Sequence, residues 1–157
     1  MDTYTHDQES YMNRMNQTAR SKFDLLQEHL APDISILDFG SGYSPEFIDA
    51  VVSTGASYTA CDHSPIVQEK LQAHGVNWLT PQTLATVEER FDIVFLSSVF
   101  HELVSYLTRE EYKQTLNTLV GILKSGGLLI VRDWANPNDD SISTITLKAK
   151  TKQEVLT

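Results

Sequence analysis

The first apolar pattern in the chain has the period of an amphipathic helix. Six apolar side chains follow one another at steps of four, four, four, three and four residues, which places them on one helix face. Pro32 cannot continue such a helix, so the pattern predicts an N-terminal helix over about residues 8–30. The six residues are Tyr11, Met15, Ala19, Phe23, Leu26 and Leu30.

Five short runs after this helix have the composition of β-strands. The first alternates too little between apolar and polar residues for a half-exposed strand, and it is typical of the buried strands of a parallel sheet. The fourth is the most strongly apolar of the set. The runs are residues 34–39, 57–62, 76–79, 91–99 and 128–134.

Helix signals separate the first three runs. Ser44 is placed to cap a helix over about residues 45–52, with a proline in its first turn. A second helix over residues 65–74 also opens with proline, and Gly75 stops it. Each of these segments therefore connects one predicted strand to the next.

A third helix lies between the last two runs. Thr108 and Glu111 form a capping box at its start, its inner face extends from Tyr112 to Leu123, and we expect residues 124–127 to end it. Strands that alternate with helices predict an α/β fold, Rossmann-like and doubly wound, with a mostly parallel sheet and helices on both faces.

The length of 157 residues fits a single domain. We assign residues 1–134 to this domain, including the N-terminal helix. Residues 135–157 are either a C-terminal extension or the remainder of the same domain. Within them, residues 141–148 (SISTITLK) form either one further strand or an irregular end.

The charge balance argues against a broad nucleic-acid surface. Twelve basic and 21 acidic residues give a net charge of -9, whereas nonspecific phosphate binding needs clustered Lys and Arg. No apolar run approaches the roughly 20 residues that cross a bilayer, and no basic segment followed by an apolar one opens the chain. The single cysteine, Cys61, fits a reducing compartment. We therefore expect a cytoplasmic protein without membrane contact.

The stretch ILDFGSGYSPEF combines a strand, a turn with two glycines and a helix start. Such a turn brings backbone close to a charged small molecule, and ligands of open α/β sheets bind at the carboxyl ends of the strands. A nicotinamide dinucleotide site needs G-x-G-x-x-G, but the third position counted from Gly40 and Gly42 is Pro45. Asp62 lies 22 residues after Gly40 at a strand end, where it either accepts hydrogen bonds from ribose hydroxyls or caps the following helix.

Four segments in order resemble the motifs of the class I S-adenosylmethionine-dependent methyltransferases. They are LDFGSGYS, ACDHS, FDIVFLSSVFHEL and LKSGGLLIVRDW, and the resemblance covers about residues 34–134. It implies S-adenosylmethionine as the cofactor and methyl transfer to an acceptor as the activity. The family's usual pair of antiparallel strands at the end of the sheet is not fully matched, since at most one candidate strand follows residue 134.

The resemblance also implies positions for the cofactor. Gly40, Ser41 and Gly42 would form the turn against its methionine part, and Asp38 would orient that turn or reach the ammonium group. Asp62 would hold the ribose.

Three further side chains complete the implied cofactor site. His63 would lie next to the adenine, Ser97 near the carboxyl edge of the sheet, and Arg14 against the methionine carboxylate. The acidic residue that usually follows the third strand is replaced here by a segment with Thr80 and Gln82. Adenine recognition would then depend on backbone groups or on Gln82.

The catalytic candidate is His101, because its imidazole can accept a proton near neutral pH when the acceptor must lose one. The alternative is that His101 and Glu102 cap and orient the next helix. Arg132 and Asp133 either face the same cleft or pair with each other. The histidines show no metal-ligand spacing, so we expect no metal site.

Two functional hypotheses therefore stand. The first is a methyltransferase whose unidentified acceptor is a small molecule or protein rather than nucleic acid. The alternative is a noncatalytic cofactor-binding or interaction module with the same fold, possibly a fragment of a longer protein. In either case another chain or a missing segment could complete the sheet.

Overall fold

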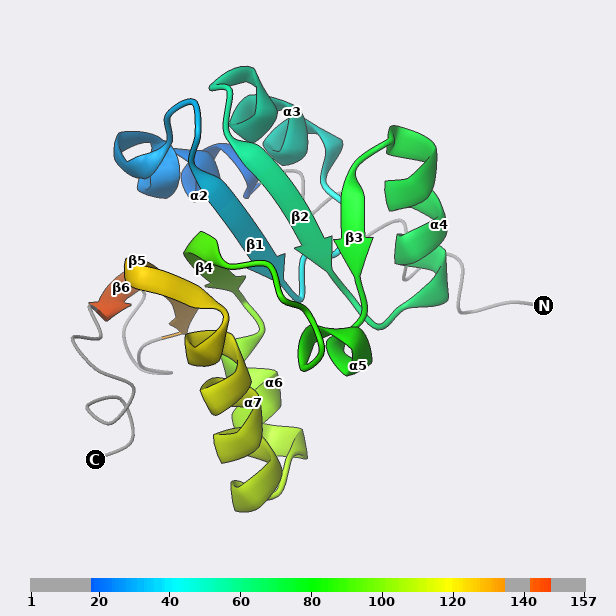
Figure 1. Ribbon diagram of the computed structural model, residues 1–157, viewed down its shortest axis with the longest axis vertical. Helices are drawn as coiled ribbons and strands as arrows, with labels where there is room; N and C mark the ends of the chain where they lie inside the picture. Colours follow the sequence, from blue (N-terminus) through cyan, green and yellow to red (C-terminus); the bar gives the residue numbers. More distant parts are fainter. Residues whose placement is uncertain (1–17, 135–141, 148–157) are drawn as a thin grey trace.

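The computed structural model describes residues 18–134 and 142–147, which form a six-stranded sheet with helices on both sides (Figure 1). The strand order is β3-β2-β1-β4-β5-β6. All neighbouring pairs from β3 to β5 are parallel, and β6 runs antiparallel to β5. The strands are β1 Ser35–Phe39, β2 Ser57–Cys61, β3 Asn77–Leu79, β4 Phe91–Ser97, β5 Leu123–Trp134 and β6 Ile142–Leu147.

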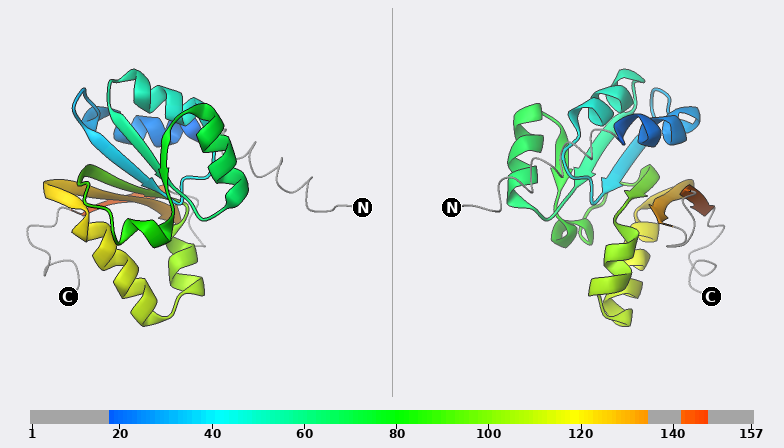
Figure 2. Two further views of the ribbon diagram at one scale, coloured as in Figure 1. Left: turned by 45° about the vertical axis from the view of Figure 1, so that its right-hand side comes forward. Right: turned by 180° about the vertical axis from the view of Figure 1, so that it is seen from behind.

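Two groups of helices cover the two faces of the sheet (Figure 2). The first group packs on one face and consists of α2 Ala19–Leu26, α3 Pro45–Ser53 and α4 Pro65–His74. The second group packs on the other face and consists of α5 Pro81–Leu84, α6 Phe100–Tyr106 and α7 Arg109–Gly121. The predicted α/β fold with helices on both faces of a mostly parallel sheet is therefore confirmed.

Alternation along the central strands divides the core into two layers. In β1, Ile36 belongs to the cluster under α2, α3 and α4, whereas Leu37 and Phe39 belong to the cluster under α5, α6 and α7. Because successive side chains of a strand point to opposite faces, Asp38 lies on the same face as Ile36. This assignment decides which polar side chains can meet at the carboxyl edge.

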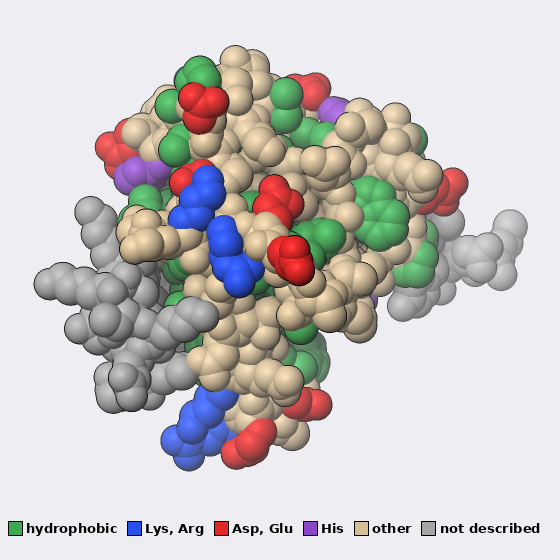
Figure 3. Space-filling view, viewed as in Figure 1, with side chains coloured by type: hydrophobic (Ala, Val, Ile, Leu, Met, Phe, Trp, Pro, Cys, Tyr) green, Lys and Arg blue, Asp and Glu red, His purple; other side chains and the backbone are tan. Residues whose placement is uncertain are grey.

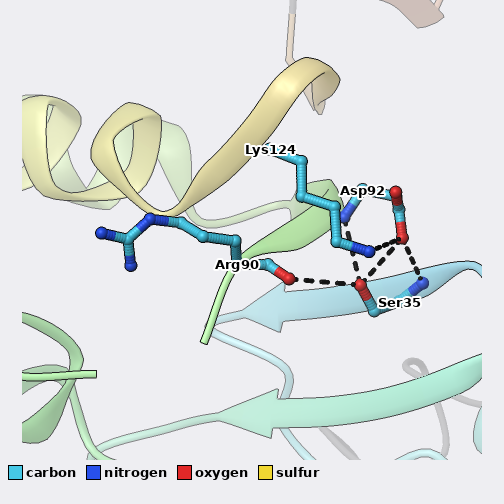
Figure 4. A network of polar contacts seen from close by, with 4 residues as sticks. All are labelled: Ser35, Arg90, Asp92 and Lys124. Carbon is cyan, nitrogen blue, oxygen red and sulfur yellow. Dashed lines mark hydrogen bonds and ion pairs between the residues drawn. The ribbon is translucent and has the colours of Figure 1, made fainter. Parts of the chain in front are cut away.

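A polar network fixes the opposite, amino edge of the sheet (Figure 4). The Asp92 carboxylate accepts hydrogen bonds from the Ser35 backbone N–H at 2.8 Å, the Ser35 hydroxyl at 2.9 Å and the Lys124 ammonium at 2.7 Å. The Ser35 hydroxyl also lies 3.4 Å from the Arg90 carbonyl oxygen. These contacts join β1, β4 and β5 far from the glycine turn, so we assign them to stability.

The predicted end of the third helix is wrong. Helix α7 ends at Gly121, and Leu123 pairs with Phe91 as the first residue of β5. The next pair in register is Ile93 with Leu128, so residues 124–127 form a bulge rather than a helix end. Gly127 fits there because a Cβ would lie only 3.0 Å from two backbone carbonyl oxygens.

The other boundaries differ less from the prediction. The N-terminal helix is described from Ala19 and ends in a 3-10 turn, Gln27–His29, while its predicted part before residue 18 lies outside the described residues. The helices α5 and α6 were not predicted as separate elements. Of the two alternatives for residues 141–148, the structure has the strand, β6.

Candidate functional site

The glycine turn follows β1 and crosses the end of β2. Gly40 and Gly42 have positive φ angles of 68° and 57°, a conformation that favours glycine. The backbone N–H groups of Gly40 and Ser41 both donate to the Cys61 carbonyl, at 2.8 and 3.2 Å. A Cβ at Gly40 would lie 2.5 Å from Cγ2 of Val99, so close packing against the segment after β4 also requires this glycine.

Asp62 connects the glycine turn to the start of α4. One carboxylate oxygen accepts from the Gly42 N–H at 2.9 Å, and the other accepts from the Ser64 N–H at 2.8 Å. The Asp62 side chain is thus part of the start of α4, which was one of the two roles predicted from the sequence. Asp62 also lines the cavity described next, and an ionised carboxylate has about four acceptor positions, of which these bonds occupy two.

A cavity of about 920 Å³ opens at the carboxyl ends of β1 and β2. It lies on the face of the sheet that α5, α6 and α7 cover. Its apolar wall includes Phe39, Leu84, Val99 and Leu103, and its polar wall includes Asp62, Gln82 and Glu102. An apolar cleft with a few placed polar groups is typical of small-molecule sites.

The wall of this cavity extends further than the sequence indicated. Tyr106, on α6, is 83% exposed and lines it, as do Glu111, Gln114 and Thr118 from α7. Apart from Glu111 in the capping box, these residues carry no motif, and their helical spacing alone gave no sign that they border a ligand site. Only the packing of α6 and α7 beside α5 brings them there.

Asp38 does not line this cavity, because its side chain points to the face under α2 and α3. Only 2% of Asp38 is exposed, and it accepts a hydrogen bond from the Tyr58 hydroxyl at 2.8 Å. Burial raises the pKa of Asp38, an effect that the Lys22 ammonium and the Tyr58 hydrogen bond oppose. The Asp38 carboxylate therefore links β1 to Tyr58 of β2.

The predicted turn serine is also buried. Ser41 is 4% exposed, and its hydroxyl donates to the Gly42 carbonyl at 3.0 Å. It stabilises the turn conformation through this local bond.

The remaining implied cofactor residues differ in whether they reach the cavity. His63 lines the cavity with its side chain 81% exposed, and its Nδ1 is 3.9 Å from Asp62. Gln82 also lines the cavity, whereas Thr80 caps α5 through reciprocal bonds with Thr83. Arg14 lies outside the described residues.

Ser97 lies at the end of β4 on the face opposite the cavity. It is 7% exposed, and its hydroxyl accepts a hydrogen bond from Nη1 of Arg132 at 3.3 Å. The next residue, Ser98, has a positive φ of 58° and is exposed. Non-glycine residues in this conformation occur often at functional sites.

His101 pairs with Asp133 at the end of β5. The imidazole Nδ1 is 2.7 Å from one carboxylate oxygen, and the His101 backbone N–H donates to the other at 2.9 Å. Asp133 therefore pairs with His101 and not with Arg132, whose side chain points to the opposite face of the strand. The His101 side chain is 47% exposed, and it is not part of the cavity wall.

The carboxylate in this pair fixes the imidazole. When Nδ1 donates its proton to Asp133, Nε2 is left as the proton acceptor. Among the described residues, Asp133 is the only hydrogen-bond partner of the ring. The structure thus shows His101 at a helix start held by Asp133, with its imidazole oriented by the same carboxylate.

The described part of the chain contains no group of three or more His, Cys, Asp or Glu side chains that could hold a metal ion. None of its helices is long and apolar enough to cross a membrane. On the face in Figure 3, Lys and Arg side chains form small separate groups among acidic ones, with no continuous basic surface.

Several solved structures with a similar fold are described as methyltransferases. A SAM-dependent methyltransferase from Archaeoglobus fulgidus has a TM-score of 0.66 at 16% identity, over 85% of this chain and 59% of that one. An amino pentose methyltransferase from Micromonospora echinaspora, solved with bound SAM, has a TM-score of 0.64 at 17% identity, over 87% and 59%. A 1,6-didemethyltoxoflavin-N1-methyltransferase from Burkholderia thailandensis has a TM-score of 0.62 at 17% identity, over 87% and 60%. The chain thus spans less than two thirds of the length of these three proteins.

At the sequence level, no curated protein matches the chain. A family model does match it, over residues 10–153, and its description is methyltransferase domain. Because this match spans nearly the whole sequence, the chain belongs to the methyltransferase domain family.

Proposed function

We propose that this protein binds S-adenosylmethionine and transfers its methyl group to a small-molecule acceptor. The observation that carries the proposal is Asp62, a largely buried carboxylate that braces the glycine turn and lines the cavity at the carboxyl ends of β1 and β2. The family match and the two structural neighbours solved with SAM or S-adenosylhomocysteine support the same cofactor. The acceptors in the printed names of those neighbours are small molecules, which supports that class here.

The cavity has the chemistry that this cofactor needs. The open acceptor positions of the Asp62 carboxylate suit the two hydroxyls of a ribose. Phe39, Leu84 and Leu103 provide an apolar wall for an aromatic base, and Gln82 offers an amide to its edge. We infer that Gly40 and Gly42 leave the backbone accessible to the amino-acid end, with Asp38 linking the preceding strand β1 to β2.

When bound, S-adenosylmethionine supplies an electrophilic methyl group on a sulfonium. The protein's own contribution is to position an acceptor in line with that group and to exclude water. When the acceptor must lose a proton, we infer that Nε2 of His101 accepts it, while Asp133 holds the ring through Nδ1. This pair lies at the end of β5, beside the segment that follows β4.

Cofactor binding is tested by calorimetry with S-adenosylhomocysteine. We expect Asp62→Asn to weaken binding by about tenfold or more, because charge-assisted hydrogen bonds are lost. Asp24→Asn removes an exposed carboxylate on α2 and serves as the matched control. Because Asp62 also braces the turn, Gln82→Ala tests the cavity wall without that structural bond. No heat with the wild-type protein would refute cofactor binding.

Catalysis is tested by incubating the protein with labelled methyl donor and fractions of small metabolites. We expect His101→Gln to lower kcat by about 10²-fold or more while leaving S-adenosylhomocysteine affinity unchanged. Asp133→Asn should also lower kcat, since the amide holds the His101 ring and its backbone N–H less strongly than the carboxylate does. An equal loss of cofactor affinity in His101→Gln would contradict this assignment.

Cofactor binding without labelling of any fraction would favour the alternative hypothesis of a noncatalytic module. We place the protein in the cytoplasm because its one cysteine, Cys61, is a buried thiol, which suits a reducing compartment.

A further inference from the structure

Two cationic side chains are buried together under α2, on the face of the sheet opposite the cavity. Lys22 on α2 is 4% exposed, and Arg132 on β5 is 9% exposed. Side chains of these types are almost never fully buried unless they are paired. Neither belongs to the cavity wall or to the His101–Asp133 pair, so their burial needs a separate explanation.

Neither cation has an ion-pair partner among the described residues. The Arg132 guanidinium donates to two hydroxyls, Ser97 at 3.3 Å and Ser21 at 3.2 Å. It has five N–H donors, so most of its capacity is not used by described residues. The Lys22 ammonium lies 5.7 Å from the centroid of the Phe47 ring, and no described oxygen accepts a hydrogen bond from it.

These donors are not sealed inside the protein. Among the described residues, no fully enclosed side-chain nitrogen or oxygen lacks a hydrogen-bond partner. The Lys22 ammonium and the Nε of Arg132, which make no hydrogen bond to a described residue, must therefore keep some contact with solvent.

Each cation feels one carboxylate without forming an ion pair with it. Asp38, which already accepts the Tyr58 hydroxyl, acts on Lys22. Asp133, which already pairs with His101, acts on Arg132. Burial lowers the pKa of Lys22, Asp38 opposes this effect, and Arg132 lowers it further. Two like charges in a largely dry site repel each other, and an anion between them would relieve that repulsion.

We propose that Lys22 and Arg132 bind an anionic group of the methyl acceptor, with the hydroxyls of Ser21 and Ser97 holding the guanidinium in place. This inference rests on the proposed function, and it restricts the acceptor class to molecules with a carboxylate or phosphate. The guanidinium fork suits either group, because both accept two parallel hydrogen bonds. Arg132 directly precedes Asp133, so the anion site and the pair with His101 lie on opposite faces at the same end of β5.

The location favours the acceptor over the cofactor as the source of the anion. The cavity with Asp62 lies under α5, α6 and α7, whereas Lys22 and Arg132 lie under α2. Arg132 on β5 is also separated by two strands, β1 and β4, from β2, at whose end Asp62 lies. An acceptor anchored by Arg132 would instead lie at the end of β5, the strand that also carries Asp133, the partner of His101.

The test is an NMR titration of the arginine Nε–H signals with sodium acetate, sodium phosphate and uncharged acetamide. The Arg132 signal is assigned from its loss in Arg132→Lys. We expect it to shift and saturate with at least one anion and not with acetamide. Lys22→Met should raise the fitted dissociation constant by about tenfold. Lys113 is an exposed lysine on α7, and Lys113→Met should leave the constant unchanged.

The outcomes separate the proposal from its rivals. A shift that does not saturate, or that Lys22→Met leaves intact, would show an adventitious ion only and overturn the proposal. If S-adenosylhomocysteine itself moves the Arg132 signal and blocks acetate, while 5′-methylthioadenosine does neither, the cations bind the cofactor carboxylate and the acceptor assignment fails.

Two controls keep these outcomes interpretable. Calorimetry with S-adenosylhomocysteine on the same sample tests the proposed function independently, since the anion titration needs no cofactor. Thermal unfolding checks that Lys22→Met folds. Ser21→Ala, at an exposed position, gives a second variant that removes one hydrogen bond to Arg132, and it too should weaken anion binding.

Discussion

Gly40 offers the sharpest test of how the glycine turn is built. Alanine there would incur two separate costs. The first is the positive φ of 68°, which costs an L-residue about 1–2 kcal/mol. The second is overlap with Val99, because the new Cβ would lie 2.5 Å from Cγ2 and 2.9 Å from Cβ. Overpacking of this kind typically costs about 1–3 kcal/mol, so Gly40→Ala should destabilise the protein by roughly 2–5 kcal/mol in total.

Gly75→Ala isolates the first cost. Gly75 has a φ of 81° at the end of α4, and a Cβ there would meet no atom within 4 Å. The two variants should therefore differ by the overlap alone, about 1–3 kcal/mol. At roughly 2–4 °C per kcal/mol for a domain of this size, the Gly40 variant should melt about 2–12 °C below the Gly75 variant.

A double-mutant cycle identifies the partner. Urea unfolding of the wild-type protein, Gly40→Ala, Val99→Ala and the double variant gives the coupling free energy between the two positions. Val99→Ala removes the 2.5 Å contact but keeps the Cβ at 2.9 Å, so it should relieve most of the overlap and not all of it. Equal stability of the Gly40 and Gly75 variants, or no coupling with Val99, would refute this account of the turn.

Three further predictions follow from other contacts. Asp92→Asn should cost about 1–2 kcal/mol at pH 7, because the Asp92 carboxylate accepts three hydrogen bonds, one of them from Lys124. Burial acts to raise the pKa of Asp92, but the Lys124 and β1 hydrogen bonds outweigh it and lower the pKa. The Asp92 carboxylate therefore stabilises the protein fully above its unfolded pKa of about 3.9, and this stabilisation is lost as pH falls through the lower folded pKa. Urea unfolding gives the difference in unfolding free energy between the wild-type protein and Asp92→Asn. A difference that stays unchanged down to pH 2 would contradict this account. Burial raises the pKa of the Cys61 thiol to about 12, so a thiol reagent at pH 8 should label Cys61 only at the rate of unfolding, and rapid labelling of the folded protein would exclude this environment. Tyr43→Phe removes the 3.1 Å contact with His74 next to the glycine turn, and calorimetry should show weaker S-adenosylhomocysteine binding with a loss of stability of only about 0.5–1.5 kcal/mol; unchanged affinity would show that this contact does not position the turn.

Local chemistry explains which features the sequence determined. The buried strands were recognisable because a parallel strand covered on both faces must be apolar throughout, as β4 is. The capping box of Thr108 and Glu111 and the stop at Gly75 were also correct, since each depends on backbone bonds within a few residues. The glycine turn was also recognisable from neighbouring residues, but its close contact with Val99 was not.

Features that depend on strand pairing could not be predicted from the sequence. Residues 124–127 carry good helix-ending chemistry, but pairing of Leu123 with Phe91 made them a bulge within β5. The short helix α5 forms because Thr80 and Thr83 bond reciprocally, a signal that was present and missed. Tertiary contacts and a weak local motif thus account for the two kinds of error.

The sequence by itself determined the α/β fold and the place of the glycine turn and Asp62 at neighbouring strand ends, because both follow from short-range patterns. Only the tertiary structure decided which side chains from distant parts of the sequence meet. It joined His101 to Asp133 across 32 positions and Arg132 to Ser21 across 111. Such pairs arise from strand order and from the face to which each side chain points, and neither is encoded within the local segment that supplies the residue.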